Sequence, residues 1–136
     1  RGEFKNSTPE KPVIDVSRWE RAMNGQAIRI LHSINQGEYG GETLLYWDDE
    51  KKSLAYLYVT TAGFQTAGTM TFADGKFTSV EKVKGAAEGV TEVKAIGEVR
   101  ADGTLVNKSE YFRDGKWEPG HEVTYREDPK AEVVFR

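Results

Sequence analysis

The chain has no cysteine in its 136 residues. This absence excludes a disulfide framework, a thiolate metal site and a cysteine nucleophile, and with them several classes of enzyme. The sequence also has no run of 18 apolar residues, so no membrane-spanning helix is predicted. No charged-then-apolar leader is present either. The chain starts at Arg1 rather than Met, so a leader removed by processing remains compatible with it, and export stays open.

Clustered positive charge is also lacking. The formal net charge is −3, and the charged residues, 30% of the chain, include lysines and arginines that are scattered along it. A nucleic-acid-binding domain is expected to be basic, with its cations gathered on one face. We therefore predict no nucleic-acid partner. The length predicts one domain over residues 1–136, large enough to bury a core without disulfides or a structural metal.

Tight turns are the most informative feature that is present. Asn-Gly or Asp-Gly pairs occur at residues 24–25, 74–75, 102–103 and 114–115, between segments of alternating apolar and polar residues. These pairs suit two-residue hairpin loops, because both central residues need a positive φ that Gly, Asn and Asp tolerate. The sequence therefore predicts a series of β-hairpins.

Segments with strand character follow one another along the whole chain. The stretch from Val13 to Met23 is compatible with a helix, but a strand is favoured because residues 24–25 join it directly to the next strand. The ten predicted strands are residues 13–23, 26–35, 42–47, 53–61, 65–73, 76–84, 90–101, 104–113, 116–126 and 131–136. A flat sheet of this size would leave open edges, and closure removes them. We predict an all-β fold, an antiparallel up-and-down meander closed into a barrel of about ten strands.

The predicted barrel has two further features. Pro119-Gly120 interrupts a strand, and because proline cannot donate to a sheet ladder, the pair predicts a bulge or bend near the barrel rim. A barrel of ten strands is usually too wide for its own side chains to fill. We therefore expect an internal cavity in which a few inward polar groups would orient a ligand.

The two histidines are candidates for contact with such a ligand. His32 shares a face with Ile28, Ile30 and Ile34, where an imidazole serves either as a hydrogen-bonded core group or as a ligand contact. His121 follows the Pro119-Gly120 interruption. The simpler interpretation is a histidine in a surface turn, and the functional interpretation is a histidine at the rim of the pocket. The histidines lie in unrelated segments without metal-ligand spacing, so we predict no metal site.

Aromatic residues supply the other candidates. Tyr56 and Tyr58 share one face of the most apolar predicted strand, and a phenol combines apolar area with a polar group, although cross-strand packing explains them equally well. Trp19, Phe64 and Tyr111 complete the set of expected ligand contacts.

No catalytic motif stands out, and no catalytic residue is assigned. The strand carboxylates are Glu20, Glu81, Glu92, Glu98 and Glu110, and solvated faces explain most of them. The sequence has no G-x-S-x-G nucleophile elbow and no Gly-rich phosphate loop.

Several short segments together resemble a known group of proteins. They are residues 17–21 (SRWER), 40–43 (GGET), 60–64 (TTAGF), 115–117 (GKW) and 131–136 (AEVVFR). The chain resembles small bacterial calycin-like proteins, barrel relatives of lipocalins and fatty-acid-binding proteins. In such families a Gly-x-Trp motif marks the first strand and a late arginine packs across that tryptophan. Residues 1–4 lack the motif, so it either lies upstream or the barrel is divergent.

The resemblance also bears on cofactor, location and function. Related barrels of the nitrobindin type bind haem through a histidine near the chain end, which this chain lacks, so no cofactor is expected. The resemblance implies an exported bacterial protein, periplasmic or secreted. We expect a barrel that binds a small, largely apolar molecule. The alternatives are an enzyme that uses His32 with a buried carboxylate, and an interaction scaffold that uses residues 37–41 or an exposed strand edge; oligomeric state is not predicted.

Overall fold

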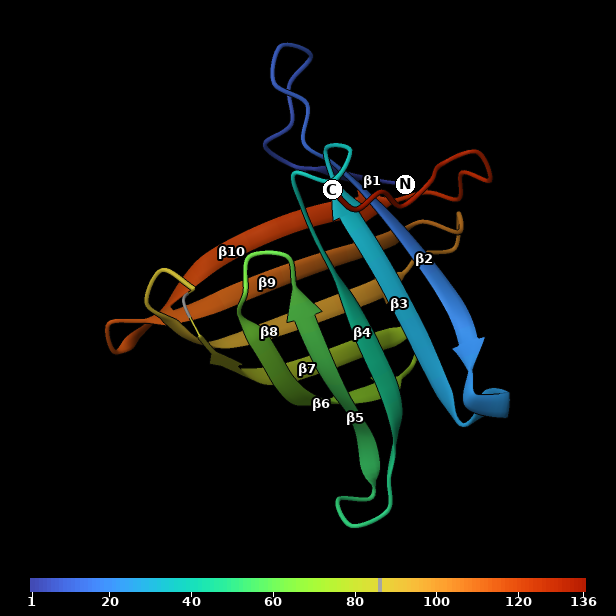
Figure 1. Cartoon of the computed structure of the whole chain (residues 1–136), viewed down its shortest axis with the longest axis vertical. Helices are drawn as coiled ribbons and strands as arrows, with labels where there is room; N and C mark the ends of the chain where they lie inside the picture. Colours follow the sequence, from blue (N-terminus) through green and yellow to red (C-terminus); the bar gives the residue numbers. More distant parts are fainter. Residues whose placement is uncertain (86) are drawn as a thin grey trace.

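The computed structural model describes residues 1–85 and 87–136, and ten antiparallel strands form a closed barrel (Figure 1). The strands follow each other around the barrel in chain order, and β1 closes it by pairing with both β10 and β2. Their bounds are β1 (Gly2–Phe4), β2 (Ile14–Ala22), β3 (Ala27–Ile34), β4 (Tyr39–Asp48), β5 (Ser53–Thr60), β6 (Gln65–Ala73), β7 (Lys76–Lys84), β8 (Val90–Val99), β9 (Leu105–Arg113) and β10 (Lys116–Tyr125). The predicted all-β meander barrel is therefore confirmed.

The turns differ in how closely they follow the prediction. Asp74-Gly75 and Asp114-Gly115 form two-residue hairpin loops, and all four residues have positive φ. Asp102-Gly103 lies in a longer connection, because the last pair of the hairpin joins Val99 to Leu105. Asn24-Gly25 belongs to a short 3₁₀ turn, Met23–Gly25, that joins β2 to β3. The segment before that turn is a strand, as favoured over the helix.

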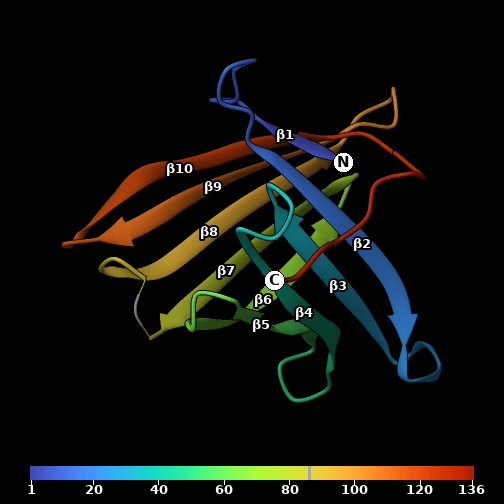
Figure 2. The ribbon, with the colours of Figure 1, turned by 45° about the horizontal axis from the view of Figure 1, so that its top comes forward.

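The tenth strand is not the one that the sequence predicted. Residues 131–136 form no strand, and the short segment Gly2–Phe4 takes the closing position instead. The physical reason is pairing: β10 already has β9 on one side and β1 on the other, so no edge is left for the chain end. Figure 2 shows β1 lying between β10 and β2.

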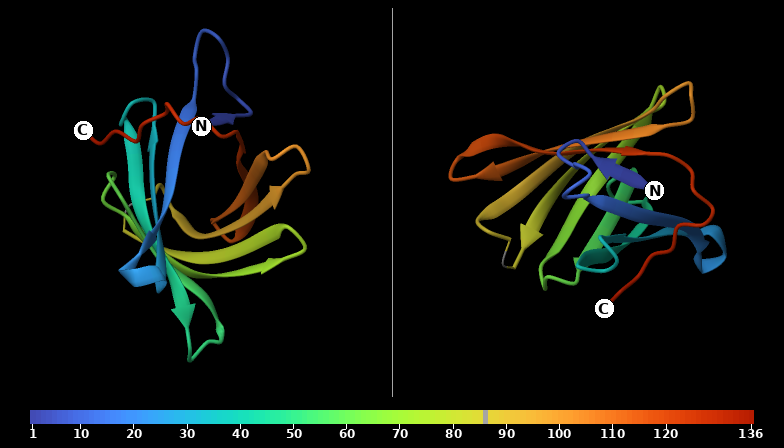
Figure 3. Two further views of the ribbon diagram at one scale, coloured as in Figure 1. Left: turned by 90° about the vertical axis from the view of Figure 1, so that its right-hand side faces the viewer. Right: turned by 90° about the horizontal axis from the view of Figure 1, so that it is seen from above.

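The chain end instead lies against the outside of the barrel. After β10 it crosses the outer face near β2 and β3 (Figure 3), and the Val134 amide donates to Ser33 Oγ at 3.0 Å. Ser33 is buried although it faces outward. The same segment reaches the loop before β4, where the Val134 carbonyl lies close to Gly37. Residues 37–41, considered above as an interaction loop, are therefore partly covered by the chain's own end.

The alternation along β3 places Ile30, Ile34 and His32 on the inner face of the barrel, and Ala27, Leu31 and Ser33 on the outer face. Ile30, His32 and Ile34 line the interior, whereas Arg29 points outward and bonds to Glu42 at 2.8 Å and to Glu20 at 3.2 Å. The register between β9 and β10 shifts between Pro119 and Glu122, which confirms the predicted bulge. Within residues 1–85 and 87–136, no helix is long and apolar enough to cross a membrane.

Candidate functional site

The barrel contains a large open cavity, as expected for ten strands, and the lining of this cavity extends from the inner wall to loop residues at the rims. Its volume is about 1680 Å³, more than most drug-sized ligands need. The wall combines aliphatic and aromatic side chains with an unusual number of polar ones. These polar groups include five tyrosines, two histidines and two carboxylates: Tyr39, Tyr56, Tyr58, Tyr111, Tyr125, His32, His121, Asp15 and Glu81.

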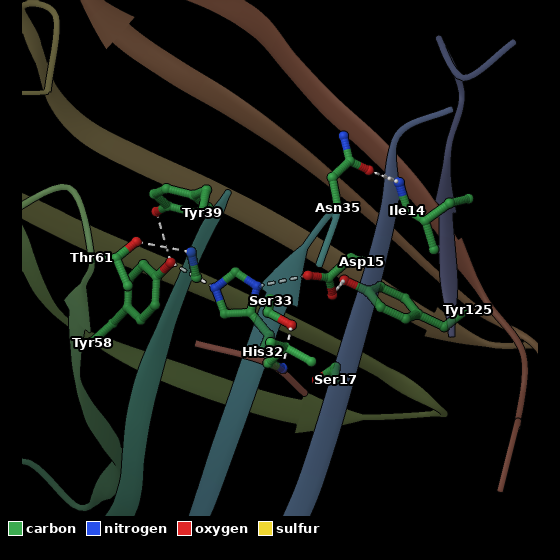
Figure 4. A network of polar contacts seen from close by, with 12 residues as sticks. Ile14, Asp15, Ser17, His32, Ser33, Asn35, Tyr39, Tyr58, Thr61 and Tyr125 are labelled. Carbon is green, nitrogen blue, oxygen red and sulfur yellow. Dashed lines mark hydrogen bonds and ion pairs between the residues drawn. The ribbon is translucent and has the colours of Figure 1, made fainter. Parts of the chain in front are cut away.

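A connected polar network lies at one end of this cavity (Figure 4). Asp15 is only 1% exposed, and its Oδ1 lies 2.8 Å from His32 Nδ1. The other imidazole nitrogen, Nε2, lies 2.7 Å from the Tyr58 hydroxyl, which in turn lies 2.8 Å from the Tyr39 hydroxyl. On the far side, the Tyr125 hydroxyl donates to Asp15 Oδ2 at 2.8 Å. Five side chains from β2, β3, β4, β5 and β10 thus form one chain of hydrogen bonds.

Two links in this network cross a strand that lies between the partners, and both cross at a glycine. Tyr125 on β10 reaches Asp15 on β2 over Gly2, the residue of β1 that pairs with both. A Cβ at Gly2 would lie 2.5 Å from the Tyr125 ring. Likewise Tyr58 on β5 reaches His32 on β3 over β4 at Gly41, where a Cβ would lie 2.3 Å from the Tyr58 ring. Each bond is therefore possible because the intervening strand has a glycine, which has no Cβ, at the crossing point.

A second cluster surrounds Glu81. Its Oε2 accepts a hydrogen bond from the Thr66 hydroxyl at 2.6 Å, and both side chains face the cavity. Burial raises the pKa of Glu81, and hydrogen bonds from Thr66 and Tyr56 oppose that shift without cancelling it. Burial also raises the pKa of Tyr56. Solvated faces were expected for most of the strand carboxylates, and the register of β7 with β6 and β8 places Glu81 inside.

His121 forms the centre of a third cluster. Its Nδ1 contacts the Tyr111 hydroxyl and also lies 3.1 Å from Ser109 Oγ. The Phe4 ring lies beside the imidazole with centroids 5.6 Å apart. Burial lowers the pKa of His121, because the cationic form loses hydration there. The surface-turn interpretation of this residue is thus wrong: the bulge at Pro119-Gly120 turns it into the barrel.

The structure brings most of the remaining predicted residues to the same cavity. Tyr56, Tyr58 and Tyr111 line it within the clusters described above. Phe64 stacks on Tyr39 with ring centroids 6.4 Å apart. Trp19 also lines it, but is 49% exposed and lies toward an open end, with its indole N–H donating to Ser17 Oγ at 3.1 Å.

Two further cavity-lining side chains have unused hydrogen-bonding capacity. Asn107 Oδ1 and Arg113 Nε are buried and have no hydrogen-bond partner among residues 1–85 and 87–136. Buried polar atoms are rarely left unpaired, so an unpaired one calls for a ligand, a water molecule or an ion. A site of this kind suits a guest with some polar atoms.

The sequence reasoning missed three members of the polar network, Asp15, Tyr39 and Tyr125, as site residues. Tyr125 was only one of many aromatics, and Tyr39 lies in a Gly-rich stretch that we predicted as a connection but that begins β4. Asp15 lies on the same strand face as Trp19, but its place beside His32 depends on the register of β2 with β3, in which it pairs with Ile34.

No group of three or more metal-binding side chains occurs in the part of the chain that the structure describes. Comparison with known proteins adds no assignment: no model of a known protein family matches the chain, and no curated protein matches it in sequence. The fold and the cavity therefore carry the functional argument. The closed ten-stranded antiparallel barrel is consistent with a calycin-like architecture.

Proposed function

We propose that the barrel binds a small, largely apolar molecule in its interior, as the resemblance to lipocalins and fatty-acid-binding proteins implies. The observation that carries the proposal is the cavity itself, about 1680 Å³ of space that includes the barrel interior and its open rims. Apolar cavity walls favour an apolar guest, because each buried Å² of apolar surface contributes about 25 cal/mol. The polar clusters then supply a small number of fixed contacts that orient it.

The candidate contacts are the residues whose side chains reach this space. Tyr39 and Tyr58 would hold a polar group of the guest beside His32, while Phe64 and Tyr111 would contact its apolar part. His121, Tyr56 and Trp19 line other parts of the same wall.

The first experiment compares the native and denatured masses of the purified protein. An additional mass that disappears on denaturation supports an occupied barrel and identifies the class of molecule. The protein is then stripped and titrated with the environment-sensitive dye 1-anilinonaphthalene-8-sulfonate, whose fluorescence rises in an apolar pocket.

A matched pair of variants assigns dye binding to the interior. Ala95 lines the cavity, whereas Ala67 is exposed on the outer face of β6. Ala95→Phe should fill the cavity and weaken binding of the dye, and Ala67→Phe should leave it unchanged. Equal binding by wild type and Ala95→Phe, or no binding by wild type, would contradict the proposal.

One observation favours a second candidate, an enzyme that uses acid–base chemistry. Glu81, whose pKa is raised by burial, faces the same cavity as the Asp15–His32–Tyr58 hydrogen bonds. A carboxylate of raised pKa opposite hydrogen-bonded phenols is an arrangement able to move a proton on a bound carbonyl compound. We infer an isomerase or hydrolase in this case. Turnover on a candidate substrate that survives in Glu81→Gln and His32→Ala would exclude these roles.

We also propose, from the resemblance alone, that the mature protein is periplasmic or secreted in a bacterium. Fractionation of cells expressing the full-length gene product tests this proposal. Recovery in the cytoplasmic fraction would contradict it.

A further inference from the structure

The hydrogen bonds of the polar network have a fixed direction that begins at Asp15. As a carboxylate, Asp15 can only accept. The Tyr125 hydroxyl donates to Oδ2, and the contact between Oδ1 and His32 Nδ1 therefore requires a proton on that nitrogen. With His32 neutral, its proton is thus on Nδ1, and Nε2 carries only a lone pair.

Each bond then determines the next. Because His32 Nε2 can only accept, the Tyr58 hydroxyl must donate to it across their 2.7 Å contact. The single hydroxyl proton of Tyr58 is thereby used. The 2.8 Å contact between the two phenols is then a hydrogen bond in which Tyr39 donates to the Tyr58 oxygen.

Tyr39 is the last group of this chain, and its oxygen is left with acceptor capacity only. Its one proton points to Tyr58, and no other hydrogen bond to its hydroxyl occurs among residues 1–85 and 87–136. The side chain lines the cavity, and its ring is held against Phe64. Burial raises the pKa of Tyr39, so the group remains a phenol in mildly alkaline solution.

We propose that the cavity selects, at Tyr39, for ligands that donate a hydrogen bond, alcohols or phenols, over ethers and ketones of the same skeleton. The inference rests on the proposed function and adds the chemical class of the guest's polar group. An alcohol can donate to the free lone pairs of the Tyr39 oxygen. An ether or ketone would place its own lone pairs against them, with no proton between.

The direction depends on His32 being neutral, because an imidazolium would donate from both nitrogens and free the proton at Tyr39. The titratable groups that face this ring are Asp15 on β2, Tyr39 on β4, Tyr58 on β5, Glu81 on β7, and His121 and Tyr125 on β10. The test is therefore made in mildly alkaline buffer, which favours the neutral form of imidazole.

The probes are 2-naphthalenemethanol and its methyl ether, which share an apolar body and differ in the O–H donor. Equilibrium dialysis gives a dissociation constant for each with wild type and with Tyr39→Phe. For each protein we compare the affinity for the alcohol with the affinity for the ether. The extra methyl group of the ether affects both proteins equally, so its effect cancels when the variant is compared with wild type. We expect the alcohol-over-ether affinity ratio to be about three- to tenfold lower in Tyr39→Phe than in wild type, as for the loss of one hydrogen bond.

Two more variants make the test specific. Tyr58→Phe removes the acceptor that holds the Tyr39 proton, so this variant should also lose the preference for the alcohol. Tyr46→Phe changes a tyrosine of β4 that is 39% exposed and lies outside both the cavity and the network, and it should keep the wild-type ratio. If Tyr39→Phe does not fold, the affinity ratios of Tyr58→Phe and Tyr46→Phe are compared instead.

The outcomes separate this inference from the function on which it rests. Binding of both probes with equal ratios in wild type, Tyr39→Phe and Tyr58→Phe would overturn the donor preference while ligand binding stands. Failure of wild type to bind either probe or 1-anilinonaphthalene-8-sulfonate would overturn ligand binding itself, and the preference with it.

Discussion

The hydrogen bond between Asp15 and Tyr125 should make an unusually large and coupled contribution to stability. Asp15 is 1% exposed and accepts from Tyr125 and His32, each at 2.8 Å. Tyr125→Phe removes one hydrogen bond to a charged group, at a cost of about 1.5–3 kcal/mol. Asp15→Ala leaves two buried donors unpaired, at about 1–3 kcal/mol each, or about 2–6 kcal/mol together.

The double variant Asp15→Ala/Tyr125→Phe gives the coupling energy between the two side chains. Once Asp15 is gone, the Tyr125 hydroxyl has lost its partner, so removing it as well should cost little. The double variant should therefore be more stable than additivity predicts, by about 1–3 kcal/mol. Tyr46→Phe is the matched control, because Tyr46 is 39% exposed and should not couple to Asp15. Urea denaturation followed by tryptophan fluorescence gives the free energy of unfolding of wild type, the two single variants and the double variant. A coupling energy below about 0.5 kcal/mol would refute the reasoning.

Three further predictions concern the other parts of the site. Gly41→Ala should push the Tyr58 ring off His32 and lower the free energy of unfolding by about 2–4 kcal/mol, and an unchanged urea midpoint would contradict it. Because the pKa of Glu81 is raised, the free energy of unfolding of wild type should fall as pH rises above about 4.3 toward that pKa. Thermal melts of Glu81→Gln should lack this fall, and a pH dependence of the melting temperature equal to that of wild type would count against the prediction. Because the pKa of His121 is lowered, stability should fall as pH drops below about 6.5, and melts of His121→Gln should be flatter there, whereas a steeper loss would disprove the assignment.

Local signals in the sequence were sufficient for most of the fold. The strands at residues 65–73 and 76–84 have the predicted bounds, and Asp74-Gly75 forms the predicted two-residue loop between them. The reason is that a type of turn with two positive φ values is encoded by two adjacent residues, and the alternation on either side fixes which face is buried.

Closure of the barrel was not predictable in the same way. Gly2–Phe4 is too short to show any periodicity, and its strand state comes from pairing with β2 and with β10, which lies more than 100 residues away. Residues 131–136 include Val133, Val134 and Phe135, residue types that favour strands, but they have no free edge to pair with. Which of the two segments joins the sheet depends on the order of all ten strands, and no local pattern reports it.

The site was predicted in part for a related reason. His32 could be identified because the isoleucines on its face marked that face as inward. Asp15 and Tyr39 could not, because their role comes from the registers that place them next to His32 and Tyr58. For Glu81 and His121 the sequence left a surface position as the simpler interpretation, since charge and a neighbouring proline favour the surface on average, while the barrel interior here is partly polar.

The crossing at Gly2 has a mechanical consequence. β1 has only three residues, so it is the strand of the barrel most easily detached from its neighbours. The Asp15–Tyr125 bond passes over this strand and joins β2 to β10 directly. The seam between β2 and β10 is therefore joined in two ways, through the backbone pairs of β1 and through one side-chain bond. Loss of the β1 pairs alone would leave a direct link between the two sides of the seam.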